Sequence, residues 1–186
     1  MSVTKASLWR RAVLTLVAGS AMALPLSAQA DYTHGLSVRV GIFVPSRGLV
    51  RDITDFGAWG AGIDYKLPFK SLLNGEHWST SVSADFHYSG RVAGVLRSFP
   101  VSINQIYTFE EQNGRTPFAG FCVTANTFGT TGTLFRQPTV TRFGAGLILG
   151  VNLTNKFYLE GRYEWIDKHG AIETPEGFRG YLGYRF

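Results

Sequence analysis

The chain has 186 residues, a length suited to one domain, and its only cysteine, Cys122, excludes an intrachain disulfide bond. Charged residues make up 17% of the chain, below the ~25% of an ordinary soluble domain, whereas aromatic residues reach 14% and glycine is abundant. The formal net charge of +5 lies largely in the N-terminal segment described next, so it is no argument for nucleic-acid binding.

Residues 1–30 have the pattern of a secretory signal peptide. Three basic residues precede an apolar stretch, AVLTLVAGSAMALPL, and small residues at Ala28 and Ala30 predict cleavage before Asp31. An uncleaved membrane anchor is the alternative, but the stretch is shorter than the ~20 apolar residues that a spanning helix needs. We therefore expect a mature domain over 31–186 with a formal charge of +2, because the signal carries three positive and no negative residues.

The mature sequence returns repeatedly to a period of two, which is typical of strands with one apolar face. In GLSVRVGIFVP, for example, Val38, Val40 and Ile42 alternate with Ser37 and Arg39. No helical period of any length appears outside the signal. Eight strands are expected, over residues 35–44, 57–67, 78–89, 93–109, 117–128, 138–152, 156–166 and 177–186.

The connections between these segments support an up-and-down order only in part. With a periplasmic N-terminus, the connections after the odd-numbered strands face the outside, where bacterial barrels carry their longer loops. The tight LTNKF turn fits the periplasmic side, whereas the connection PFKSLLNGEH is long for that side. Pro100 lies within the fourth segment, where it predicts a weakened strand or a β-bulge.

The alternation alone does not distinguish a soluble barrel, whose apolar face points inward, from a membrane barrel, whose apolar face points outward. Glycine and serine crowd the polar face, as at Gly60, Gly62 and Ser83, whereas a soluble exterior favours longer polar side chains. Aromatic residues stand near the ends of the apolar face, which suits the interfacial girdles of a membrane barrel. Ten tilted residues also span about 25 Å, the height of the apolar band. The sequence therefore predicts an all-β fold, an eight-stranded antiparallel up-and-down transmembrane β-barrel.

Several stretches resemble the small outer-membrane β-barrel superfamily, which includes the opacity-type proteins and the outer-membrane protein A and W groups. They are TPFAGFCV, then FGAGLILGVNL with FYLEGRYEW, and the terminal GYLGYRF. The resemblance implies the bacterial outer membrane as location, with its lipid and lipopolysaccharide as surroundings. In that family a C-terminal Phe on the last strand is read by the barrel assembly machinery. By resemblance, Leu182, Tyr184 and Phe186 form that assembly signal.

The polar face carries enough charge to form a network inside the barrel. Neighbouring strands seven and eight contribute charges of both signs, so ion pairs between them are plausible. A gated polar lumen is one interpretation, and a salt-bridge network that fills the lumen is the other, favoured because eight strands leave little open bore. The residues expected in this network are Arg39, Asp64, Lys66, Glu160, Arg162, Glu164, Arg179 and Arg185.

ADFHYSG presents the sharpest enzymatic pattern, since Asp85, His87 and Ser89 share one face of one strand. His87-Tyr88-Ser89 is similar to the His-x-Ser pair of the outer-membrane lipid A deacylases. That family's pair lies close to the C-terminus with an acid downstream, whereas four or five strands follow here. Residues at i and i+2 of a strand are also ~6.6 Å apart, too far for a direct hydrogen bond. A polar lumen facet is the alternative reading.

No cofactor and no metal site is expected. The four histidines are scattered without ligand spacing, and GAGLILG lies in a strand pattern that opens no helix. Cys122 is interpreted either as a packed residue or as part of the barrel wall. We expect a monomeric, non-enzymatic barrel that is structural or surface-interacting, with a largely plugged polar lumen. The alternatives are a narrow, porin-like channel for small hydrophobic molecules, as in the protein W group, and a lipid A-modifying enzyme.

Overall fold

The computed structural model describes residues 35–46, 50–52, 57–68, 72–73, 75–91, 94–131, 137–168 and 174–186. Eight strands account for most of them: β1 (Leu36–Pro45), β2 (Ala58–Lys66), β3 (Trp78–Arg91), β4 (Gly94–Thr108), β5 (Thr116–Thr131), β6 (Gln137–Asn152), β7 (Phe157–Ile166) and β8 (Gly177–Arg185). Each strand begins and ends within a few residues of the range expected for it. The signal peptide predicted over 1–30 lies outside the described residues and stays a prediction.

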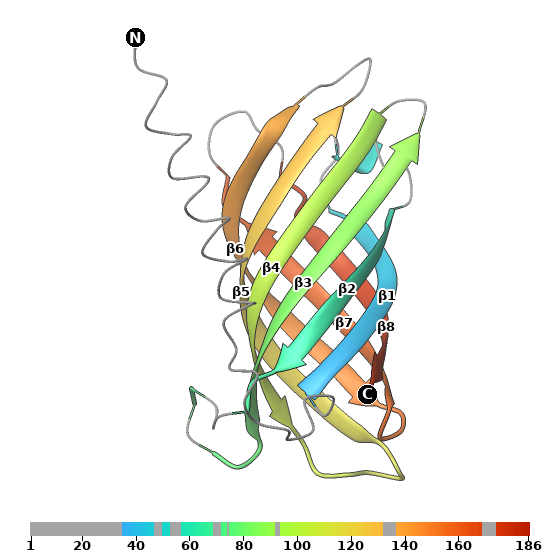
Figure 1. The fold of residues 1–186 in the computed structure, drawn as a ribbon, viewed down its shortest axis with the longest axis vertical. Coiled ribbons are helices and arrows are strands. Elements are labelled where there is room, and N and C mark those ends of the chain that lie inside the picture. Colours follow the sequence, from blue (N-terminus) through green and yellow to red (C-terminus); the bar gives the residue numbers. More distant parts are fainter. Residues whose placement is uncertain are drawn as a thin grey trace, which may run out of the picture. The chain divides into compact units, whose positions relative to one another are not determined.

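The eight strands close into one barrel in sequence order (Figure 1). Every strand pairs antiparallel with the next, and β1 returns to β8 with Val40 opposite Leu182. Closure leaves neither β1 nor β8 with a free edge, which is the condition for a sheet to cross lipid. The predicted fold class is confirmed. Within the described residues, no helix is long and apolar enough to cross a membrane.

The alternation along each strand separates an apolar exterior from a charged interior. On β1, Val40 points outward and is 59% exposed, whereas its neighbour Arg39 points inward and is 2% exposed. Trp59 on β2 is 77% exposed on the same outer surface. So large an apolar surface is unfavourable in water, and charged side chains are unfavourable in contact with lipid. This is the distribution of a membrane barrel, and it confirms the orientation inferred from the small residues of the polar face.

Glycines alternate with large side chains around the interior. In each row of paired residues across neighbouring strands, the glycines leave room for the large side chains. Across three strands the row runs from Arg39 over Gly62 to Asp85. In a second such row, Gly41 and Gly60 lie between Tyr181 and His87. A Cβ atom at any of these glycines would collide with a neighbouring side chain or with backbone. The predicted role of small residues, to make room for long charged ones, follows from this packing.

Replacing Gly41 by alanine is expected to lower the free energy of unfolding by roughly 1–3 kcal/mol. The added Cβ would overlap the main-chain carbonyl of Gly180 and approach the Tyr181 ring, and the backbone oxygen cannot rotate away. Urea unfolding in lipid vesicles measures the change. Gly180→Ala on the outer face of β8 is the matched control, because its nearest neighbours stand at 3.5 and 3.9 Å. Equal stabilities for the two variants would contradict the packing described.

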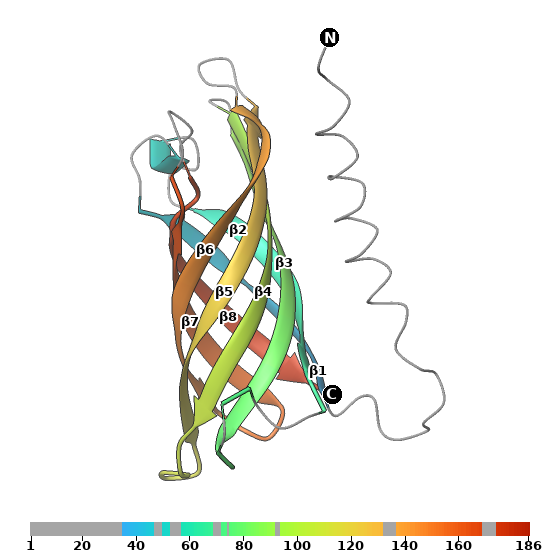
Figure 2. The same ribbon diagram turned by 90° about the vertical axis from the view of Figure 1, so that its left-hand side faces the viewer.

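The barrel wall is taller on one side than on the other. Strands β3 to β6 have 14 to 16 residues, whereas the other four have 9 or 10. The long strands rise past their neighbours at the end opposite the C-terminus (Figure 2). Pro100, where a weakened strand or a β-bulge was expected, causes no change of register: β4 runs on through it, although its pairing with β3 is not continuous at Phe99 and Pro100. The register shift occurs instead between Phe128 and Thr130 in the pairing of β5 with β6.

Candidate functional site: the charged lumen

A buried arginine of β1 joins two other strands across the lumen. The Arg39 guanidinium donates two hydrogen bonds of 2.7 Å to the Asp85 carboxylate on β3, one to each oxygen. Its Nη1 donates a third bond, of 3.0 Å, to Glu160 Oε1 on β7. All three side chains are almost fully buried. A bidentate pair of this kind is among the stronger polar contacts in proteins, and here it ties β1 to β3 over the intervening β2.

The chain of charges continues along β7 to β8. Arg162 donates a 2.9 Å hydrogen bond to Glu160 Oε1, and its Nη1 lies 3.8 Å from Glu164 Oε1. Arg179 Nη1 lies 2.7 Å from the other oxygen of Glu164. Three cations therefore alternate with three anions, and the chain is electrically neutral. Charges removed from water need such partners, so the network carries its own compensation.

Aromatic rings close the gaps between these ion pairs. The Arg39 guanidinium stacks over the Tyr181 ring at 4.4 Å, and Arg179 stacks over Phe43 at 4.7 Å. The Tyr181 hydroxyl reaches across the lumen to within 3.0 Å of His87 Nε2. Phe43 and His87 both have 0% exposure. The middle of the barrel is therefore filled from wall to wall by its own side chains.

A polar cavity of about 280 Å³ opens below this plug, at the end where β1 begins and β8 ends. Asp64, Glu160 and Arg185 are the charged groups that line it together with Lys66, and Tyr158 and Phe118 narrow it. The Asp64 carboxylate accepts hydrogen bonds from Ser81 and Asn104. The cavity is a vestibule that the ion-pair plug closes at its inner end.

Comparisons with known proteins place the fold. No protein-family model matches the sequence, and no curated protein matches it. Among solved structures, Neisserial surface protein A is 16% identical, with a TM-score of 0.57 over 80% of this chain and 92% of that one. The outer-membrane enzyme PagL is 14% identical, with a TM-score of 0.57 over 80% of this chain and 97% of that one. The chain has the fold of the small outer-membrane β-barrels. The resemblance inferred from the sequence is confirmed at this level.

Within the described barrel, five of the eight residues expected in a lumen network join one chain of contacts: Arg39, Glu160, Arg162, Glu164 and Arg179. The remaining three lie nearer the vestibule. Asp64 is bound by uncharged donors, Lys66 is exposed at the end of β2, and Arg185 stacks on Tyr158 at 4.8 Å.

Asp85 also belongs to the network, as the partner of Arg39. The sequence groups it instead with His87 and Ser89 in a candidate catalytic facet. The three side chains of that facet, Asp85, His87 and Ser89, all lie inside the barrel. Within the described residues no hydrogen bond joins any two of them, and His87 Nδ1 has no partner. A triad needs an acid that orients the imidazole and a nucleophile within its reach. Asp85 is instead held by Arg39, and all three side chains of the facet are buried on the inward face of β3.

The residues that sequence reasoning missed are the aromatic members of the plug. Phe43, Tyr158 and Tyr181 point inward, on the strand face that also carries the charges. The alternation places all three on the polar face, but only charged residues of that face were expected in the lumen network. Within the described residues, no group of three or more His, Cys, Asp or Glu side chains is arranged to hold a metal ion.

Proposed function

We propose that the chain is a non-enzymatic barrel of a bacterial outer membrane, structural or surface-interacting, whose lumen is closed by its own ion pairs. The observation that carries this proposal is the neutral chain that runs from Asp85 through Arg39, Glu160, Arg162 and Glu164 to Arg179. A conducting pore needs a continuous water path, and these contacts cross that path. The apolar outer wall supports the membrane location.

Conductance across a planar lipid bilayer tests the plug. The full chain, refolded and inserted, is expected to give no discrete current steps, while a general porin inserted under the same conditions gives them. Heat-modifiable migration on a gel measures the folded fraction, so that a lack of current steps is not caused by unfolded protein. Reproducible steps from the folded protein would overturn the proposal in favour of the alternative, a narrow channel. A channel for small hydrophobic molecules fits less well, because charged and hydroxyl groups line the lumen.

A second measurement addresses lipid A modification. Mass spectra of lipid A from cells that carry the wild-type chain and from cells that carry Ser89→Ala are expected to be the same, because Ser89 is 6% exposed inside the barrel. Loss of a modified lipid A species in the variant alone would assign an enzymatic role to the Asp85, His87 and Ser89 facet.

The last strand supports the proposed route into the membrane. Leu182 and Tyr184 stand on the outer face of β8, and Phe186 directly follows that strand; Leu182 is 47% exposed and Phe186 50%. An apolar C-terminal strand edge of this kind suits recognition by the barrel assembly machinery. The barrel is proposed to act as a monomer, since closure already pairs both edge strands.

A further inference from the structure

Arg97 on β4 breaks the rule that the outer wall follows everywhere else on the strands. The outward positions of the eight strands carry aliphatic, aromatic, small or uncharged polar residues, and Arg97 is the only charged residue among them. It is exposed, between the equally outward Val95 and Phe99. A cation on a lipid-facing wall is costly unless it meets water or an anion. Its retention there calls for a partner outside the chain.

The pairing of β3 and β4 gives the depth of this arginine. Arg97 lies opposite Tyr88, and Tyr88 lies opposite Trp59, so the three side chains form one outward row. Tyr and Trp gather where the apolar band of a membrane meets the headgroups. Trp59 is the second residue of β2, and β2 begins beside the last residues of β1, at the end of the barrel opposite the one where β8 ends. Arg97 therefore lies at headgroup level, where lipid phosphates are found.

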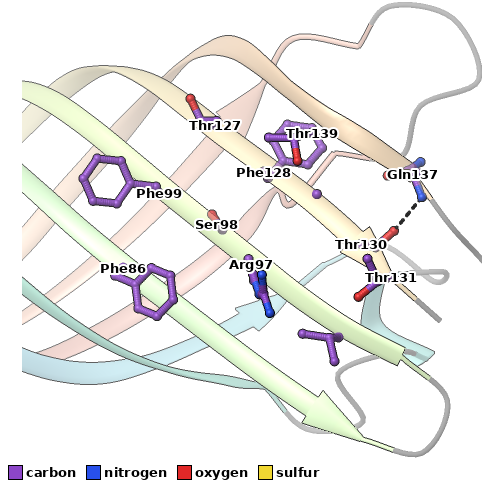
Figure 3. A pocket seen from close by; sticks show the side chains of 12 residues that line it. Phe86, Arg97, Ser98, Phe99, Thr127, Phe128, Thr130, Thr131, Gln137 and Thr139 are labelled. Carbon is purple, nitrogen blue, oxygen red and sulfur yellow. Dashed lines mark hydrogen bonds between the residues drawn. The ribbon is translucent and has the colours of Figure 1, made fainter. Parts of the chain in front are cut away.

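A groove of about 190 Å³ opens in the outer wall beside Arg97 (Figure 3). Gly129, opposite Arg97 on β5, lines the groove without a side chain of its own, and Thr139 lies close against it, since a Cβ at Gly129 would stand 2.9 Å from Thr139 Oγ1. The register shift between Phe128 and Thr130 lies at the same place, and β5 pairs with β6 on both sides of it. A glycine and a β-bulge therefore stand where the groove opens.

The groove has a polar end and an apolar end. Thr131 and Thr139 line it beside Arg97, while Phe86 and Phe99, each 47% exposed, line the part that lies deeper along the strands. Thr127 continues the hydroxyl row and bonds to Thr141 at 2.8 Å. The guanidinium and hydroxyl groups at one end suit the anionic head of an amphiphile. The two aromatic rings at the other end suit its acyl chain.

Arg97 has no competing partner within the described residues, where it makes neither an ion pair nor a hydrogen bond. The three buried arginines of the lumen, by contrast, each contact a carboxylate. A guanidinium presents paired N–H donors that match two oxygens of a phosphate. Arg97 is thus available for a phosphate that arrives from the lipid side.

We propose that this groove binds a phosphate-bearing lipid of the outer leaflet, lipid A, with a phosphate on Arg97 and an acyl chain along Phe86 and Phe99. This proposal rests on the membrane location given under Proposed function. It adds a specific lipid site on the outer wall, formed by β3 to β6 and separate from the lumen network. Lipid held there would anchor the tall side of the barrel in the outer leaflet.

Native mass spectrometry of the full chain in detergent micelles, with purified lipid A as the probe, tests the site. Wild type is expected to retain one lipid A, and Arg97→Gln is expected to bind it at least about ten-fold more weakly, the size of one charge-assisted contact. Lys66→Gln is the matched control, since it removes an exposed cation at the opposite end of the barrel. It is expected to bind as wild type does.

Three further samples separate the contributions. Dephosphorylated lipid A is expected to lose the preference for wild type over Arg97→Gln, and inorganic phosphate alone is expected not to bind measurably. Gly129→Leu fills the groove without changing charge and is expected to weaken lipid A binding as well. Equal binding of lipid A by wild type and Arg97→Gln, or by phosphorylated and dephosphorylated lipid, would overturn the proposal. Heat-modifiable migration checks each variant for folding, so a folded barrel without lipid binding refutes this site alone.

Discussion

Replacement of Arg39 by methionine is expected to lower the free energy of unfolding by about 3–5 kcal/mol, the cost of leaving a buried charge unpaired. Arg39 supplies both hydrogen bonds to the Asp85 carboxylate and one to Glu160. Methionine fills a similar volume, so the loss reports charge rather than a cavity. Glu160 keeps Arg162 as a partner, but Asp85 has no second ion-pair partner within the described residues. Urea unfolding in lipid vesicles gives the measurement.

A double variant separates the ion pair from the general cost of mutation. Asp85→Leu combined with Arg39→Met removes both charges, so the pair is expected to be less destabilised than the sum of the single variants. Lys66→Met removes an exposed cation and is expected to stay within about 0.5 kcal/mol of wild type. If Arg39→Met cost no more than Lys66→Met, the lumen would be wet and the network would not be a plug.

The second large effect is expected on the outer wall. Val40→Arg places a cation at the middle of β1, between Ala61 and Leu182, where the wall faces the centre of the bilayer. The free energy of unfolding is expected to fall by about 2–4 kcal/mol, the cost measured for arginine at the midplane of membrane barrels. In a soluble barrel the same change at a residue that is 59% exposed would be nearly neutral.

The control for that prediction is the same substitution at a different depth. Phe157→Arg lies at the first residue of β7, beside the end of the apolar band, and is 45% exposed. There the loss is expected to be only about 0–1 kcal/mol. Equal losses at positions 40 and 157 would contradict a depth-dependent lipid environment.

The fold was predictable because one physical pattern repeats from residue 35 to the last strand. Each strand alternates apolar and small or charged residues, and Val40 beside Arg39 is enough to assign the two faces of β1. The predicted export signal in a chain with one cysteine, and the glycines on the polar face, then favour a barrel with charges inside. The observed strand ends differ from the expected ones by a few residues, because turn residues mark the ends of strands only weakly.

The ion-pair partners were not predictable from the sequence, because they depend on the rows that barrel closure creates. Arg39 reaches Asp85 two strands away, and it does so because Gly62 lies between them in the same row. Between β7 and β8 the directly opposed residues are Arg162 and Arg179, a like-charged pair. Glu164 offsets this repulsion from a diagonal position, where its carboxylate oxygens lie 3.8 Å from Arg162 Nη1 and 2.7 Å from Arg179 Nη1.

The outer groove was equally hidden. It lies at the register shift between Phe128 and Thr130, which interrupts the inward and outward alternation of β6, and the polar residues Gln137 and Thr139 beside the shift give no apolar signal of where it occurs. The sequence shows Arg97 as a charge in the fourth strand. Whether its side chain points inward or outward depends on whether Pro100 interrupts the alternation of that strand. The catalytic reading of Asp85, His87 and Ser89 rested on a shared face, and that face points into the lumen.

Quenching of tryptophan fluorescence by brominated phospholipids tests the central claim, an apolar face toward lipid and charges inside, most directly. In the chain from residue 31 onward the tryptophans are Trp59, Trp78 and Trp165, and all three occupy outward positions on their strands. The account predicts strong quenching of the refolded protein in vesicles by lipids brominated near the headgroup end of the acyl chains. Emission that stays unchanged with every brominated lipid would contradict it, since the tryptophans would then face the inside of a soluble barrel.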